Sequence, residues 1–163
     1  MLPGQTLENT SNLLQKIEHF CDYQERCIYD VDQKLRSWKV PPHEIREIMK
    51  QLLAGKFIDE DRFARSYVRG KFHINKWGRI KIIFELRRRN IPENLIRNAI
   101  SEIGEEDYLF TIRDLVIRKK QEIYLGKNLK VREKIITFVT GKGFEFNLAE
   151  KTLTELNISN DHT

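Results

Sequence analysis

The chain repeats a pattern of apolar residues about every 50 positions, and this repeat constrains its fold more than any other feature. Four positions recur at an offset of 51 residues, in the pairs Leu35/Leu86, Val40/Ile91, Pro41/Pro92 and Ile45/Ile96. A third copy follows at an offset of 53, which maps Ile82, Leu86, Ile91, Leu95 and Ile100 onto Ile135, Val139, Phe144, Leu148 and Leu153. Each copy predicts a helix, a tight break and a second helix, because proline suits the first helical turn and not the interior. Such periods are typical of tandem structural repeats.

Apolar spacing along the chain is helical, and strand-like alternation is almost absent. Phe63, Tyr67 and Val68 form one apolar stripe, and Asp59 precedes it as a helix cap. A unit of about 50 residues is too small to bury a sizeable core alone, so neighbouring units must pack end to end. We therefore predict an all-α fold of tandem three-helix units that form an elongated, curved array, right-handed or left-handed.

The spacing also places the boundaries of the units. We expect three-helix repeats at residues 12–57, 58–104 and 105–157. The ends, 1–11 and 158–163, match nothing in the repeat and are expected to be flexible, as chain termini often are.

Positive charge is concentrated in the middle of the chain. The formal net charge over 163 residues is +5, but residues 56–100 carry 12 basic and 5 acidic side chains, a net charge of +7. Residues 1–55 and 101–163 each have a net charge of −1. A solvated surface mixes signs along the chain, so this asymmetry indicates a localised contact with an anionic partner.

Several classes of protein are disfavoured by the composition. No apolar run is long enough to cross a membrane, and the first residues lack the basic and apolar regions of a secretion signal. Only Cys21 and Cys27 are present, so we expect no disulfide framework and a reducing, cytoplasmic location. His19 with these cysteines gives H-x-C-x5-C without a fourth ligand, so we expect no metal and no cofactor.

Catalysis is likewise not supported. Asp59, Glu60 and Asp61 form a carboxylate cluster, but their position at a predicted helix start fits capping. The chain has no glycine-rich phosphate loop, no G-x-S-x-G and no H-E-x-x-H. We therefore expect a protein that binds and does not catalyse.

The basic middle segment is the candidate binding site. Lysine and arginine neutralise phosphates, while Phe72 and Trp77 could stack on bases or pack on protein. Tyr67 and Trp77 are expected mainly to pack. Arg87, Arg88 and Arg89 close a predicted helix, where its dipole favours cations. The predicted contact residues are Arg62, Arg65, Arg69, Lys71, Lys76, Arg79 and Lys81.

The helix that begins near Arg79 leaves one alternative open. Ile82 and Leu86 form one apolar stripe, and Ile80 and Phe84 form another beside it. Either one stripe belongs to the core and the other is an exposed anchor, or the helix is buried all round.

Two segments of the chain resemble the RecX family. Residues 56–69 resemble its pattern of an aromatic, an aliphatic, two acids, then R-F-A and Y-V, and residues 78–91 resemble its second signature, a glycine and a helix ending in E-L before a break. The match covers about residues 55–103. Lys56 and Asn90 stand where the family often has glycine, and asparagine is the next-best residue for a left-handed helix end.

The resemblance implies a function. Family members are tandem three-helix proteins that bind RecA filaments on single-stranded DNA, lie in the filament groove, and damp recombinase, ATPase and coprotease activity in DNA repair. They have no catalytic site. The implied partners are the RecA filament and single-stranded DNA, directly or through the filament, with this chain acting as a monomer.

The alternative is a helix-turn-helix DNA-binding transcriptional regulator. Such a protein needs base-reading residues near the start of its recognition helix. The helix after Pro92 opens instead with Glu93 and Asn94, and the helix after Pro42 opens with His43 and Glu44. Acids at these positions repel phosphate, which disfavours this alternative.

Overall fold

The protein is a chain of helices arranged along a bent path. The computed structural model describes residues 3–125 and 130–159, and within these ranges it has no strand. The first helices are α1 (Pro3–Tyr23), α2 (Ile28–Ser37) and α3 (Pro42–Ala54). They are followed by α4 (Glu60–Arg69), a π-helical turn η1 (Gly70–Ile74), α5 (Arg79–Arg88) and α6 (Glu93–Ile100). The last are α7 (Glu105–Leu125), α8 (Val131–Gly141) and α9 (Phe146–Glu155).

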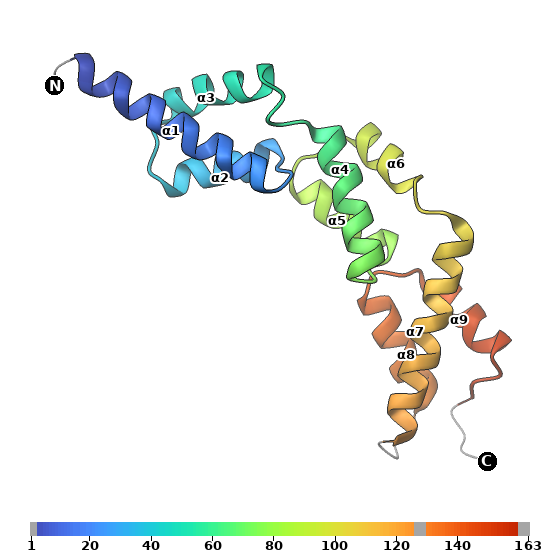
Figure 1. The fold of residues 1–163 in the computed structure, drawn as a ribbon. Helices are drawn as coiled ribbons and strands as arrows, with labels where there is room; N and C mark the ends of the chain where they lie inside the picture. Colours follow the sequence, from blue (N-terminus) through green and yellow to red (C-terminus); the bar gives the residue numbers. More distant parts are fainter. Residues whose placement is uncertain (1–2, 126–129, 160–163) are drawn as a thin grey trace.

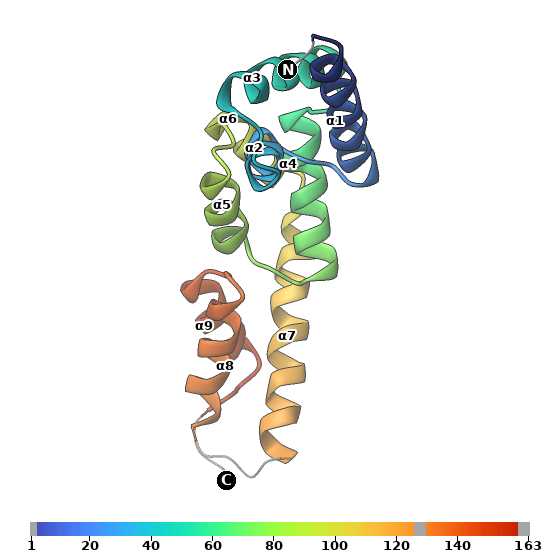
Figure 2. The same cartoon turned by 90° about the vertical axis from the view of Figure 1, so that its left-hand side faces the viewer.

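These helices succeed one another along an elongated arch. Figure 1 shows α1 to α3 at one end, α4 to α6 in the middle and α7 to α9 at the other end. The view turned by 90° shows α7 as a long helix that runs beside α8 and α9 (Figure 2). This arrangement confirms the predicted fold class, an all-α array of tandem three-helix units. The predicted flexible ends lie partly outside the description, which omits residues 1–2 and 160–163, while α1 begins at Pro3.

The sequence repeat corresponds to a repeated way of ending a helix. The second residue after the second helix of each unit has a left-handed backbone, at Lys39 (φ 60°), Asn90 (φ 57°) and Gly143 (φ 92°). The next residue donates its N–H back to a buried residue of the helix, in the pairs Val40–Leu35, Ile91–Leu86 and Phe144–Val139. This bond satisfies a carbonyl that the helix leaves free at its end. The apolar positions of the sequence repeat therefore correspond to the two residues that this bond joins at each helix end.

The buried side chains that the structure describes form two clusters. The first lies within α1 to α3 and the chain up to Ile58, and it includes Ile17, Leu35 and Leu52. The second is continuous from α4 to α9. Cys27, between α1 and α2, belongs to this second cluster, so the first unit contributes one residue to the core of its neighbour.

Candidate functional site

Two of the predicted contact arginines on α4 are held by carboxylates of the same chain. The Nε atom of Arg62 lies 2.6 Å from Oε1 of Glu25, in the loop after α1. Arg65 pairs with Asp61 at 2.9 Å, one turn away, and also with Glu102. These hydrogen bonds raise the pKa values of both guanidinium groups. The two arginines therefore hold α4 against the first unit and against the end of α6.

Arg79 at the start of α5 is enclosed still further. Its guanidinium group donates to Glu105 at 2.7 Å and to the carbonyl oxygen of Ile103 at 3.4 Å. It also lies over the ring of Tyr108, 4.0 Å from the centroid, and only 21% of the side chain is exposed. Arg79 thus joins α5 to the segment that enters α7.

Arg69 at the end of α4 differs from these three. It is exposed, and its Nε atom donates to the carbonyl oxygen of Arg65 at 3.4 Å. In the described part of the chain, Arg69 makes no ion pair with a carboxylate. Its charge is therefore available to a partner.

Four lysines gather where η1, the loop before α5 and the end of α8 meet. The ammonium groups of Lys71 and Lys81 lie over the Trp77 ring, 4.7 and 4.3 Å from its centroid. Lys76 precedes Trp77, and the Lys142 Nζ atom donates to the carbonyl oxygen of Asn75 at 3.3 Å. Among the residues that the structure describes, none of these lysines makes an ion pair with a carboxylate. We call Lys71, Lys76, Lys81 and Lys142 the lysine cluster.

The backbone explains why these lysines meet. Helix α4 continues into the wider π-helical turn η1, which changes the direction of the side chains that follow; such turns are frequent at functional sites. The N–H of Trp77 then donates to the carbonyl oxygen of Lys71 at 2.9 Å, which folds the loop back over η1. The N–H of Gly78 donates to the carbonyl oxygen of Lys142 at 2.8 Å, which brings the third unit to the same place.

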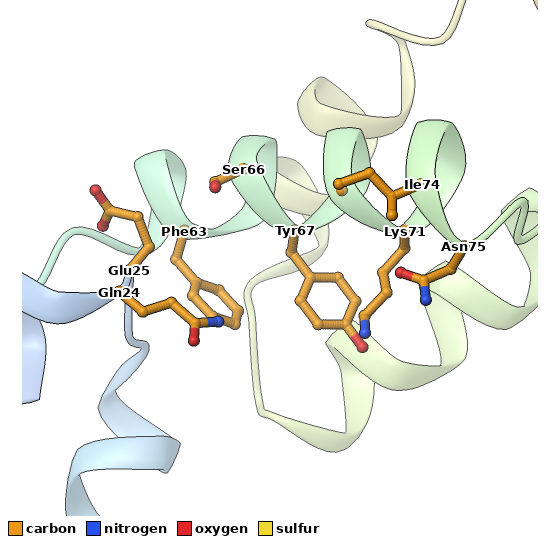
Figure 3. A pocket seen from close by; sticks show the side chains of 9 residues that line it. Gln24, Glu25, Phe63, Ser66, Tyr67, Lys71, Ile74 and Asn75 are labelled. Carbon is orange, nitrogen blue, oxygen red and sulfur yellow. The ribbon is translucent and has the colours of Figure 1, made fainter.

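A shallow hollow of about 260 Å³ lies beside the cluster, along α4 and η1. Figure 3 shows Phe63, Tyr67 and Lys71 on one side of this helix, with Glu25 at the far end of the hollow. The ammonium group of Lys71 is 5.2 Å from the centroid of Tyr67, and burial raises the pKa of the Tyr67 hydroxyl. Tyr67 and Trp77 also pack against the core, as their expected role requires.

The structure thus separates the seven cations predicted from the sequence. It brings the ammonium groups of Lys71 and Lys81 together over the Trp77 ring, with Lys76 next to Trp77 in the chain. It turns the guanidinium groups of three arginines, Arg62, Arg65 and Arg79, toward internal carboxylates. Lys142 was not predicted, because it lies in the third unit, more than 60 positions along the chain from Lys81. Lys142 lies between Gly141 and Gly143, and glycines on both sides of a residue indicate that another backbone can approach closely there. This was the signal in the sequence that could have identified Lys142.

The two stripes of α5 have different environments. Ile82 and Leu86 are fully buried, whereas Ile80 and Phe84 are 54% and 59% exposed. Of the two alternatives, the exposed stripe beside a buried one is therefore correct. The exposed pair borders the lysine cluster, because the N–H of Ile80 donates to the carbonyl oxygen of Gly143 at 3.1 Å.

The cysteines are buried thiols. Burial raises the pKa of Cys21 to about 11 and that of Cys27 to about 12. Within residues 3–125 and 130–159, no three histidine, cysteine or acidic residues are grouped as metal ligands would be. No described helix is both long and apolar enough to cross a membrane.

Comparisons with known proteins find similarity to RecX. The model of the second three-helix domain of RecX matches residues 59–100. The regulatory protein RecX of Bacillus cytotoxicus is 28% identical over 148 residues, which cover 91% of this chain and 54% of that protein. That of Clostridium acetobutylicum is 25% identical, with 81% of this chain and 63% of that protein covered. The chain is similar in sequence to RecX proteins over most of its length.

Solved RecX structures have the same fold. A crystal structure of RecX from Lactobacillus salivarius superposes with a TM-score of 0.76 at 21% identity, over 94% of this chain and 99% of that one. A second RecX crystal structure gives a TM-score of 0.81 at 22% identity, over 92% and 75% of the two chains. This chain spans little more than half the length of most of the curated RecX relatives that it matches.

Proposed function

We propose that this chain binds the RecA filament on single-stranded DNA and inhibits its recombinase, ATPase and coprotease activities during DNA repair. It acts as a monomer in the cytoplasm, by binding and without catalysis of its own. Similarity to proteins named regulatory protein RecX supports this role. The elongated, curved shape supports it too, because a long surface can contact several subunits of a polymer at once.

The lysine cluster is the observation that carries the proposal. Four ammonium groups without an internal carboxylate partner, in the described part of the chain, favour an anionic surface over solvent. A RecA–DNA filament offers phosphates and acidic side chains. Binding to phosphates releases counterions, so it weakens steeply as salt rises.

We propose Arg69 and the lysine cluster as the main contacts. We also keep three arginines, Arg62, Arg65 and Arg79, as proposed contacts that contribute less to binding. Each of them would have to exchange its carboxylate partner in this chain for one on the filament. The ion pairs of Arg62 and Arg65 are partly exposed and therefore weak, so for them this exchange costs little but also contributes little; for the more enclosed Arg79 it costs more.

The mechanism follows from the length of the array. An arch that contacts neighbouring protomers fixes their relative positions, which opposes the movements that accompany ATP turnover. The same arch covers part of the filament groove, where a second DNA strand must enter. The proposed inhibition therefore requires binding alone.

Co-sedimentation tests this proposal. The full chain is mixed with RecA, single-stranded DNA and a non-hydrolysable ATP analogue, and then with each component separately. We expect the chain to sediment with the assembled filament more than with RecA or DNA alone, and the bound fraction to fall as salt rises. Equal sedimentation without RecA would contradict the proposal, and a sequence-specific shift of duplex DNA without RecA would favour a transcriptional regulator.

A further inference from the structure

A second, separate groove lies on the first unit, between α1 and α2. Its volume is about 510 Å³, within the range of ligand sites. Three aromatic side chains line it, Phe20, Tyr23 and Trp38. Tyr23 is 81% exposed and Trp38 is 36% exposed, and neither belongs to the buried cluster of this unit.

The two charged side chains that line this groove, Lys16 and Lys34, are both cationic. No carboxylate lines it among the residues that the structure describes, and His19 completes that side of the lining. The ammonium group of Lys34 lies between two rings, 5.4 Å from the Phe20 centroid and 5.3 Å from that of Trp38. Lys34 makes no ion pair with a described carboxylate.

This lining contrasts with the rest of the unit. Residues 1–55 carry 8 acidic and 7 basic side chains, so chance would place acids beside the groove. Two of the acids instead pair elsewhere, Asp32 with Arg36 at 2.6 Å and Glu47 with Lys50 at 2.9 Å. The groove is therefore a local cationic and aromatic surface on a unit that is slightly acidic overall.

Aromatic rings between cations match one class of ligand. Bases stack on aromatic side chains, phosphates pair with lysines, and both occur together in single-stranded nucleic acid. Asn12 and Gln15, which complete the lining, can hydrogen-bond to base edges. We propose that the groove between α1 and α2 binds a segment of single-stranded nucleic acid. An acidic peptide would satisfy the lysines but not the exposed rings, and a duplex keeps its base faces enclosed.

This inference does not depend on the proposed function, because it concerns the free chain and a different surface. The lysine cluster lies on the second and third units, and the groove lies on the first. The two sites can be measured separately because the sequence has only two tryptophans, one at each site: Trp38 in the groove and Trp77 in the cluster.

Two single-tryptophan variants of the full chain provide the experiment. Trp77→Phe leaves Trp38 as the reporter of the groove, and Trp38→Phe leaves Trp77 as the reporter of the cluster. Each is titrated with a short oligothymidylate, with an abasic oligomer of equal length, and with a duplex. We expect saturable quenching of Trp38 by oligothymidylate, and clearly weaker quenching by the abasic oligomer and by the duplex.

Further substitutions in the Trp77→Phe background separate stacking from charge. Tyr23→Leu should weaken binding by about fivefold or more, since it removes one stacking surface. Because Tyr23 is 81% exposed, this change leaves the core intact, and circular dichroism verifies the helicity. Lys34→Gln should lower the slope of log affinity against log salt by about 0.7, the contribution of one phosphate contact to a single strand. The matched control is Lys50→Gln on α3, which removes an equal charge outside the groove and should leave the slope unchanged.

Three outcomes would overturn the inference. Quenching of Trp77 with no change at Trp38 would place nucleic acid only at the lysine cluster. Equal binding of the abasic oligomer would show attraction of phosphate without stacking. Absence of quenching in both variants would exclude binding of the probe at either site. None of these results decides whether the chain sediments with RecA filaments, so the two proposals can fail separately.

Discussion

The backbone N–H of Gly78 donates a hydrogen bond to the carbonyl oxygen of Lys142 over 2.8 Å, and this bond joins the start of α5 to the end of α8. The contact is backbone against backbone, because a Cβ atom on Gly78 would overlap the carbonyl group of Gly143. It sets the position of Lys142 relative to Lys81, and therefore the geometry of the lysine cluster.

Replacement of Gly78 by alanine should destabilise the joint between the second and third units. The backbone of Gly78 (φ −78°, ψ 165°) is open to any residue, so the effect comes from the clash with Gly143 alone. We expect a loss of about 1–3 kcal/mol in the free energy of unfolding, typical of overpacking. Chemical denaturation measures it. Gly70→Ala is the control: it has open space and a helical backbone, so it should stabilise by about 0.5–1 kcal/mol. Equal effects of the two changes would contradict the proposed close approach.

Tyr108→Phe should remove a buried hydrogen-bonded bridge across the same joint. The fully buried hydroxyl accepts from the backbone N–H of Arg79 at 3.0 Å and donates to Glu145 at 2.6 Å. Its removal leaves both groups without this partner, so we expect a loss of about 1–3 kcal/mol in unfolding free energy. The control is Tyr67→Phe, whose hydroxyl makes no hydrogen bond with a described residue, and it should change stability less. A smaller loss for Tyr108 than for Tyr67 would refute the bridge.

The pair Arg62–Glu25 should contribute to stability and little to filament binding. The two side chains are partly exposed, so a double-mutant cycle with Arg62→Gln and Glu25→Gln should give a coupling energy of about 0.2–1 kcal/mol. Arg62→Gln should reduce affinity for the RecA filament less than Lys81→Gln does, because Arg62 is already paired. The opposite order of affinities would make Arg62 a primary contact.

Stability should fall in alkaline solution because of the buried thiols. Burial raises the pKa of Cys27 from its ordinary value near 9 to about 12, so above pH 9 the unfolded chain releases a proton that the folded chain retains. The contribution of Cys27 to stability is therefore constant below pH 9 and decreases between pH 9 and 12, by up to about 1.4 kcal/mol per pH unit. Cys27→Ala changes packing equally at every pH, so thermal unfolding at several pH values isolates the thiol. The stability of the Cys27→Ala variant should decrease less steeply above pH 9 than that of the wild type. An identical decrease in both proteins would show that groups other than Cys27 cause it.

The sequence predicted local features of the fold well. The offsets of 51 and 53 residues correspond to the three helix ends at Lys39, Asn90 and Gly143, because each end needs an apolar residue on both sides of a left-handed position. Asp59 caps α4 as expected, since its side chain accepts from the N–H of Arg62 at 2.9 Å. Such features depend on neighbours within a few residues, which a single sequence contains.

The candidate site was less predictable, because the residues that meet there are far apart in the sequence. From the sequence alone we expected three arginines, Arg62, Arg65 and Arg79, to be free to bind a partner. In the structure each of them pairs with a carboxylate 26 to 37 positions away in the chain. Lys142 joins the lysine cluster through a backbone contact with Gly78, which no periodicity encodes. Charge patterning identified the segment that holds three of the four lysines of the cluster, and only the packing of the units distinguishes paired from unpaired cations.

Inhibition of RecA ATPase activity on single-stranded DNA tests the central claim most directly. The cluster variant combines Lys71→Gln, Lys76→Asn and Lys81→Gln, with asparagine chosen because residue 76 has a positive φ of 55°. The control combines Lys50→Gln, Lys134→Gln and Lys151→Gln, three exposed lysines outside the cluster, and changes the net charge equally. We predict that half-inhibition by the cluster variant requires about tenfold more protein than the wild type, while the control stays close to the wild type. Equal inhibition by the two variants would contradict the account.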